Sequence, residues 1–129
     1  MKTIAESGRG PKIKIKKSIF IATIFRVVSK NDVEDHISKI QEEFKKATHN
    51  AYAYRIGNPV SWEESSDDGE VKGCAGKPIM NILQKQEITN TLVVVTRFYG
   101  GVKLGPGGLI RAYSKTASGL ITAIGLENL

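Results

Sequence analysis

Alternating and continuously apolar runs predict the β-strands of this chain. In "PKIKIKKSIFIATIFRVV", Ile13 and Ile15 alternate with lysines, which is typical of a half-exposed strand at a sheet edge. From Ile19 to Val28 the run is almost wholly apolar, as in a more central strand, and "KKS" fits a bend between the two. "HNAYAYRIG" alternates as far as Gly57, and the β-branched "TLVVVTRFY" indicates a further buried strand.

Helical spacing predicts three helices. Within "SKNDVEDHISKIQEEFKKAT", apolar residues step by four and three, which places them on one helical face: Val33, Ile37, Ile40, Phe44 and Ala47. Ser29 followed by Asp32 resembles a capping box at the start of this helix. "PIMNILQKQ" predicts a second helix with Pro78 in its first turn, and apolar positions from Leu109 to Ile124 predict the last.

The order of these elements predicts the fold class. Strand, strand, helix, strand, helix, strand, helix indicates a mixed sheet with helices covering at least one face. Residues 58–77 carry turn residues and acids and are expected to form a loop. A chain of 129 residues favours one domain, residues 1–129.

Composition excludes several classes of protein. The single cysteine, Cys74, excludes an internal disulfide framework and a cysteine-built metal site. No apolar stretch reaches the roughly 18–20 residues of a membrane span, and the first residues lack the pattern of a signal peptide. We therefore expect a cytoplasmic protein with no membrane partner.

The distribution of charge says more than the net charge of +6. Lysines crowd the start of the chain at Lys12, Lys14, Lys16 and Lys17. The segment from Ile88 to Leu126 holds no acid, although it contains four basic residues: Arg97, Lys103, Arg111 and Lys115. Such a segment attracts polyanions such as RNA or phosphorylated ligands. The alternative is an ordinary basic surface, and composition alone leaves both open.

Two glycine-rich loops, each followed by a predicted helix, are the candidate functional segments. Backbone N–H groups at a helix start and in a glycine-rich turn can bind anions. The first loop is "SSDDGEVKGCAGKP", with candidate residues Asp67, Asp68, Gly69, Glu70, Gly73, Cys74 and Gly76. The second is "GGVKLGPGGLIR", with candidates Arg97, Tyr99, Gly100, Gly101, Lys103, Gly105, Gly107, Gly108 and Arg111 in and beside it. It matches neither the Walker loop nor the dinucleotide fingerprint, so no cofactor is expected.

The first loop has three interpretations. Its carboxylates suit calcium or magnesium, but the alternating acid spacing of a calcium loop is absent, so no metal is expected. An acidic turn in solvent is the simpler alternative. A third is that the two loops lie side by side around a cleft, with Arg97 and Arg111 pointing inward and Asp68 or Glu70 pairing with one of them.

Catalytic chemistry has weak support in the sequence. Cys74 near a helix start, with His49 as a possible partner, could form a nucleophilic pair. One cysteine and two histidines occur by chance in most chains of this size. We therefore expect no catalytic residue, while an enzyme or ligand site for a phosphorylated compound stays open as the alternative function.

The two loops also carry a family resemblance. "KKSIFIA", "ATHNAYAYRIG", "SDDGEVKGCAGKPI" and "VVVTRFYGGVKLGPGGLIRAYS" resemble, in order, the IMPACT/YigZ family, an uncharacterised protein family. Val71, Lys72 and Cys74 depart from the family's usual residues, and "RFYGG" reverses its usual aromatic pair. Cys74 in place of a threonine argues against thiol catalysis shared by the family.

The resemblance implies a fold and a role. The fold is an α+β two-layer sandwich similar to domain 2 of ribosomal protein S5, with a mixed sheet of about four strands and helices on one face. Bacterial relatives carry a ferredoxin-like domain after this one, and we expect it to be absent because the sequence stops at Leu129. The eukaryotic members regulate translation, so we expect a non-enzymatic module that binds RNA, the ribosome or a translation-regulatory protein.

Overall fold

A single antiparallel sheet organises the molecule. The computed structural model describes residues 1–129. The strands are β2 (Gly8–Arg9), β3 (Ile13–Ile15), β4 (Ser18–Arg26), β5 (His49–Ile56), β6 (Trp62–Ser66) and β7 (Thr91–Phe98). Their order is β2-β4-β7-β5-β6, β3 also pairs with β4, and every pair is antiparallel. Two terminal strands, β1 (Lys2–Ile4) and β8 (Leu126–Asn128), form a separate ribbon.

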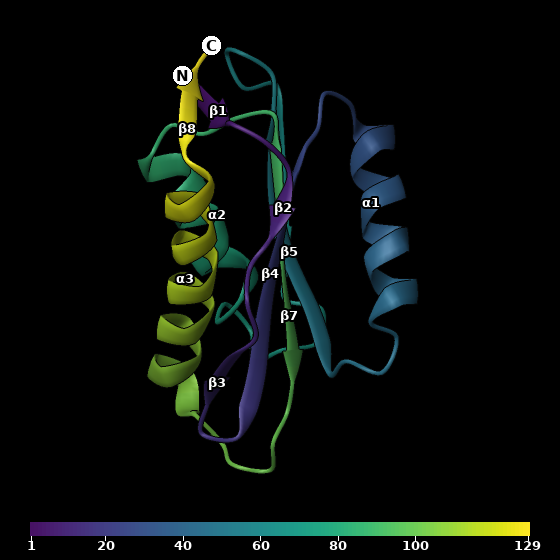
Figure 1. Cartoon of the computed structure of the whole chain (residues 1–129), viewed down its shortest axis with the longest axis vertical. Coiled ribbons are helices and arrows are strands. Elements are labelled where there is room, and N and C mark those ends of the chain that lie inside the picture. The colour runs from purple at the N-terminus through teal and green to yellow at the C-terminus, as the bar shows by residue number, and fades with distance from the viewer.

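Helices cover both faces of this sheet (Figure 1). α2 (Gly76–Lys85) and α3 (Gly105–Ile124) lie side by side on one face, and α1 (Lys30–Glu43) lies on the other. α1 begins as its sequence predicts, because Ser29 Oγ accepts the backbone N–H of Asp32 at 3.1 Å. Asp32 Oδ2 accepts the backbone N–H of Val28 at 3.0 Å, one residue before the N-cap, so the start of α1 resembles a capping box without its usual second bond.

β7 explains why the core has two parts. Val93 and Val95 point into the larger cluster under α2 and α3, whereas Leu92 and Val94 point into the smaller one under α1. Alternate side chains of a strand face opposite sides of a sheet, so a strand buried on both faces is apolar at nearly every position. The unbroken apolar run "TLVVV" therefore reflects an arrangement of three layers, in which the sheet lies between α1 and the pair α2 and α3.

The α+β class is confirmed, and several finer expectations are wrong. The sheet has six strands instead of about four, it is antiparallel instead of mixed, and helices cover two faces instead of one. Residues 58–77, expected to form a loop, contain β6. β6 is mostly exposed and acidic, so it lacks the apolar signal of a strand. The likeness to ribosomal protein S5 stays a prediction.

None of the three helices combines the length and apolar character that a membrane crossing requires.

Gly76 sits where the first loop passes under the sheet edge, and its lack of a side chain is required there. A Cβ at Gly76 would lie 2.8 Å from the backbone carbonyl atoms of Ser66. Gly119, in α3, has no atom within 4 Å of a Cβ, so an added methyl group would meet open space. We predict that Gly76→Ala lowers the free energy of unfolding by about 1–3 kcal/mol through overpacking. Gly119→Ala, the matched control, should raise it by up to about 1 kcal/mol.

Urea denaturation followed by circular dichroism measures both effects. Equal stability of the two variants would contradict the close packing of α2 against β6.

Candidate functional site

A buried ion pair joins the first loop to β7. Arg97, next to last in β7, donates from Nη1 to Glu70 Oε2 at 2.7 Å, and the two side chains are only 5% and 4% exposed. Arg97 continues the inward series of Val93 and Val95, so its side chain is directed under α3. This is the pairing between the two loops that the sequence suggested, and the structure confirms it for Glu70 and Arg97.

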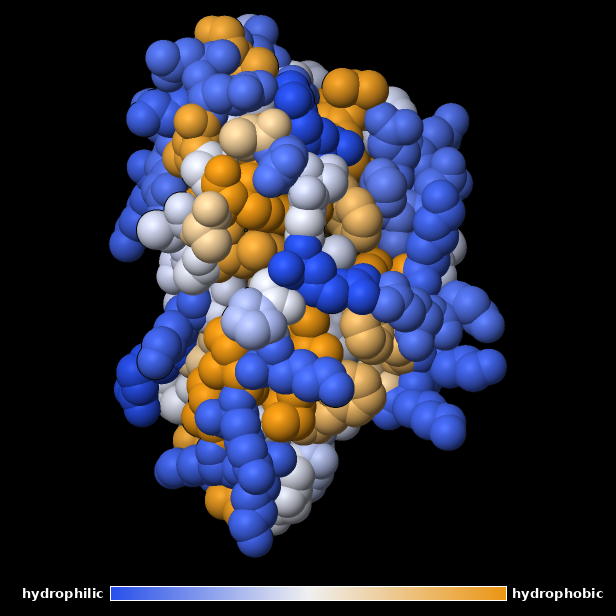
Figure 2. All heavy atoms as spheres, viewed as in Figure 1, coloured by the Kyte–Doolittle hydropathy of each residue, from blue (hydrophilic) through white to orange (hydrophobic).

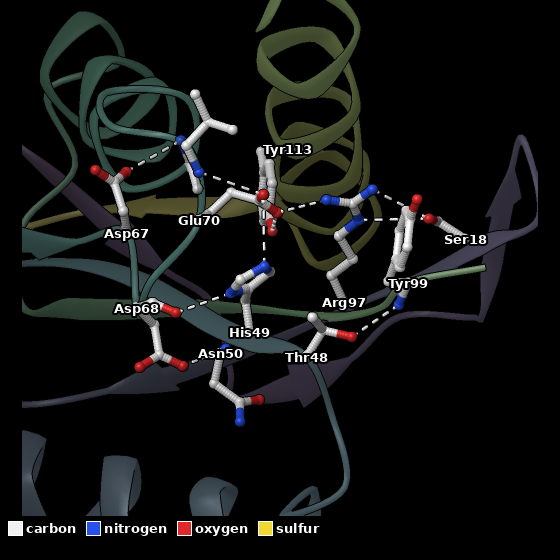
Figure 3. Close-up of polar contacts among 12 residues, drawn as sticks. Ser18, Thr48, His49, Asn50, Asp67, Asp68, Glu70, Arg97, Tyr99 and Tyr113 are labelled. Atoms are coloured by element: carbon white, nitrogen blue, oxygen red, sulfur yellow. Dashed lines mark hydrogen bonds and ion pairs between the residues drawn. The ribbon is translucent and has the colours of Figure 1, made fainter. Parts of the chain in front are cut away.

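Two hydroxyl groups complete the hydrogen bonding of this pair (Figure 3). The Tyr113 hydroxyl, from α3, donates to Glu70 Oε2 at 2.6 Å. Ser18 Oγ, at the start of β4, accepts from Arg97 Nε at 3.4 Å and Nη2 at 3.2 Å. Burial alone would raise the pKa of Glu70, but the Tyr113 hydroxyl and Arg97 outweigh it and hold that pKa below its usual value. Burial, together with the bond to Glu70, raises the pKa of Tyr113.

His49 lies beside this cluster in a fixed orientation. Its Nδ1 is 2.9 Å from the backbone oxygen of Asp68, and a carbonyl can only accept, so Nδ1 carries the hydrogen. Nε2 then lies 3.5 Å from Glu70 Oε1. The antiparallel register of β5 and β7 places His49 directly opposite Arg97, which is why both side chains reach Glu70.

The Asp67 carboxylate accepts hydrogen bonds from the backbone N–H groups at and before the start of α2. Its Oδ1 accepts the N–H groups of Ala75 at 3.2 Å and Gly76 at 2.9 Å, and its Oδ2 accepts that of Gly73 at 2.9 Å. Burial raises the pKa of Asp67, but these three backbone bonds outweigh it and lower that pKa overall. The anion predicted at the first loop is therefore a carboxylate of the loop itself.

A cavity of about 430 Å³, called here the loop cavity, opens between the two glycine loops. Glu70 and Val71 line it from the first loop and Thr48 and His49 from the start of β5; the remaining lining residues are Arg97, Tyr99, Lys103, Leu104, Gly105, Pro106 and Leu109. Tyr99 is 46% exposed, with the Arg97 guanidinium 5.3 Å from the centre of its ring. The two loops thus enclose one space, and the two opposite charges that line it, Glu70 and Arg97, are paired with each other.

A second depression of about 300 Å³, called here the basic groove, adjoins the loop cavity. It joins the β3–β4 turn to α3, and Leu104 lines both spaces. Its cations are Lys16, Arg111 and Lys115, and none of them forms an ion pair. Figure 2 shows hydrophilic side chains over apolar surface at the end of the molecule where Figure 1 places β3 and the start of α3.

The structure separates the candidates that the sequence grouped. Arg111 was expected in one cleft with Arg97, but it lines the basic groove and not the loop cavity. This expectation was wrong because helical geometry turns Arg111 to the side of α3 away from Leu109, which faces the cavity. Cys74 is 5% exposed in the core, and its thiol hydrogen-bonds only to the Lys72 backbone oxygen, at 3.8 Å.

Of the other candidates in the glycine loops, some pack against the rest of the chain and others line one of the two cavities. Gly100 packs so closely that a Cβ there would lie 2.0 Å from the Lys17 backbone oxygen. Asp68 Oδ2 accepts the backbone N–H of Asn50 at 2.7 Å, so the three loop carboxylates diverge to different partners. Neither cavity is lined by Gly69, Gly73, Gly76, Gly101 or Gly107, whereas Gly105 lines the loop cavity and Gly108 the basic groove.

Three residues of the site were missed or assigned otherwise by sequence reasoning. Ser18 is the first residue of β4 and Thr48 directly precedes β5, and neither belongs to a motif that the sequence could reveal. Tyr113 lies within the helix predicted from Leu109 to Ile124, but the sequence did not mark it as a residue of the site. It is buried, but its hydroxyl belongs to the Glu70 cluster.

Comparison with known proteins identifies relatives over most of this chain. The family model described as the Impact N-terminal domain matches residues 16–121. A curated relative, the IMPACT family member YvyE of Bacillus subtilis, is 43% identical over 124 residues, covering 96% of this chain and 57% of YvyE.

Solved structures also resemble this chain, among them these two. One, described only as a hypothetical protein, has a TM-score of 0.90 at 28% identity and covers 98% of this chain and 62% of that one. The other is the two-domain translational regulator Yih1, with a TM-score of 0.59 at 25% identity, covering 96% of this chain and 47% of Yih1. This chain therefore spans about half the length of the proteins that it resembles.

Removal of the buried cation should be costly. We predict that Arg97→Met lowers the free energy of unfolding by about 3–5 kcal/mol, because Glu70 is left charged and buried. Adding Glu70→Gln should recover part of that loss. Arg26→Met is the matched control, since the Arg26–Glu127 pair is about half exposed and its removal costs no more than about 1 kcal/mol.

Urea unfolding at neutral pH measures these differences. A decrease for Arg97→Met no larger than that of Arg26→Met would show that the pair is not a constraint on the fold.

The lowered pKa of Asp67 makes a pH-dependent prediction. A carboxylate with a depressed folded-state pKa stabilises the protein above its unfolded pKa of about 3.9, and this stabilisation is lost as the pH falls through the folded value. Asp67→Asn should therefore be less stable than the parent at neutral pH, and the difference should narrow below about pH 4. Asp35→Asn, an exposed control on α1, should show little difference at either pH. Thermal unfolding across this pH range measures the difference in stability between each variant and the parent protein. A difference for Asp67→Asn that does not change with pH would contradict the lowered pKa of Asp67.

Proposed function

This chain belongs to the IMPACT family, and from that membership and its charged surface we propose that it is a translation-regulatory module that binds RNA. The RNA is free or forms part of a ribosomal surface. A relationship to a protein described as a translational regulator supports the link to translation. A cytoplasmic location and a non-enzymatic mode of action are part of this proposal.

The observation that carries the proposal is the meeting of two acid-free segments in the basic groove. Residues 7–31 and residues 88–126 contain no aspartate or glutamate. Lys16 comes from the first segment, and Arg111 and Lys115 come from the second. Side chains far apart in the sequence thus converge as unpaired cations, and neutralising phosphates with such cations releases condensed counterions and drives binding.

The acids of the molecule strengthen this interpretation by their location. Asp67 is bound to the start of α2, Glu70 to Arg97, and Glu63 to Arg55 at 2.8 Å. These carboxylates are used internally, so they do not neutralise the basic groove. A polyanion is therefore the partner whose charge best complements this surface.

The alternative, a site for a small phosphorylated compound, has less support. In the loop cavity, Arg97 is neutralised by Glu70, and the start of α2 is occupied by Asp67. Of the residues lining that cavity, Lys103 is a cation without an ionic partner. A translation-regulatory protein with an acidic surface is the other partner that the basic groove would suit.

Binding of a fluorescent single-stranded RNA, followed by anisotropy over a range of salt, tests the proposal. We predict that replacing Lys16, Arg111 and Lys115 with glutamine together weakens binding strongly. The slope of log K against log salt should fall by about 2, because each phosphate that is no longer neutralised lowers it by about 0.7. The matched control replaces Lys39, Lys46 and Lys85, which are exposed and away from the groove, and removes the same amount of charge.

The two triple variants separate a local site from general charge. Equal weakening of both would show that net charge alone drives binding, and no binding by the parent protein at low salt would overturn the RNA proposal. In that case an acidic protein surface would be the partner to test next.

A further inference from the structure

We infer that the loop cavity receives an unpaired nucleobase of the RNA whose backbone lies along the basic groove. This inference rests on the proposed RNA-binding function and goes beyond it, because it makes the protein selective for single-stranded over double-stranded RNA. A duplex holds its bases in the stack, where they cannot enter a cavity, whereas a single strand can turn one base outward.

The cavity walls suit the flat apolar faces of a base. Val71, Leu104, Pro106 and Leu109 supply apolar surface, and a volume of about 430 Å³ is within the range of small-ligand pockets. Tyr99 stands at this cavity with nearly half its surface exposed, and its backbone N–H, not its ring, is what binds it to Thr48. Exposed aromatic rings beside a basic surface are stacking platforms for bases.

The cavity floor offers hydrogen-bonding groups of both kinds. With Nδ1 of His49 donating to the Asp68 backbone oxygen, its Nε2 faces Glu70 Oε1 at 3.5 Å. Glu70 Oε1 is a carboxylate oxygen, so it can accept a hydrogen bond from a base amino or imino group. Thr48 Oγ1 accepts the Tyr99 backbone N–H at 2.9 Å, so its own O–H can donate to a base oxygen or ring nitrogen.

The same floor disfavours a phosphate in the cavity. Glu70 is negatively charged there, and Arg97 is already bonded to both Glu70 and Ser18. A phosphate would meet repulsion from Glu70 without a free guanidinium to offset it, whereas a base carries no charge. In this arrangement a base occupies the loop cavity, and the phosphates contact the neighbouring cations of the basic groove.

The loop cavity and the basic groove are close enough for one RNA strand to occupy both. Leu104 lines both the loop cavity and the basic groove, and Lys103 lies beside it on the cavity side. The loop cavity and the cations of the basic groove therefore lie next to each other, as a single strand with one base turned inward requires.

The test compares one RNA of about 12 nucleotides, single-stranded and annealed to its complement, in a length range that one such surface can bind. The parent protein should prefer the single strand. Tyr99→Ala should weaken single-strand binding by about tenfold, the decrease expected for one stacked base, and should leave duplex binding unchanged. Tyr99→Phe keeps the ring and should restore the preference. Trp62→Ala is the matched control, because Trp62 is also 46% exposed but lies on β6, outside both spaces.

A 2-aminopurine base in the same single strand gives a direct readout of stacking. Its fluorescence should fall on binding to the parent and Tyr99→Phe proteins and not on binding to Tyr99→Ala. Circular dichroism melting establishes that each variant is folded.

The outcomes separate this inference from the function on which it rests. Equal affinity for single strand and duplex, with no effect of Tyr99→Ala, would overturn base insertion while the groove variants still report on RNA binding. Absence of all RNA binding in the parent protein would overturn both and leave a protein side chain as the occupant to consider.

Discussion

The burial of one carboxylate against one guanidinium is the constraint on which the rest of this structure depends. Glu70 and Arg97 are almost fully enclosed, and charges so placed are stable only when each has a partner and full hydrogen bonding. The partners come from different elements, with Tyr113 from α3 and Ser18 from β4. The pair therefore fixes the first loop, the end of β7 and α3 relative to one another, and this arrangement creates the loop cavity.

The same constraint determines what the surface presents. Because Glu70 and Asp67 are bound inside the molecule, their charge does not reach the face formed by the β3–β4 turn and the start of α3. The cations of the basic groove come from segments that carry no acids of their own. The acids are thus paired inside the molecule, while the cations of the basic groove stay unpaired at its surface. This distribution of charge favours a polyanionic partner.

The sequence predicted the elements with strong periodicity: α1, α2, α3, β5 and β7 were all anticipated from apolar spacing. A pairing of Asp68 or Glu70 with Arg97 or Arg111 was one of three interpretations of the first loop, and the structure shows Glu70 with Arg97. The second helical layer was missed, because the resemblance implied helices on one face and the run "TLVVV" was interpreted only as a buried strand; the structure buries it on both faces.

Other features carried no local signal. β6 is an exposed acidic strand whose place is set by pairing with β5, and the orientation of His49 depends on a backbone oxygen of Asp68. Arg111 was assigned to the wrong space because the rotation of α3 relative to the loops is a tertiary property. The measurement that tests the account most directly is mapping of backbone amide NMR shifts as a single-stranded RNA is added. The account predicts shifts concentrated at Lys16, Tyr99, Lys103, Arg111 and Lys115, with α1 unaffected; shifts centred on α1, or none at any residue, would contradict it.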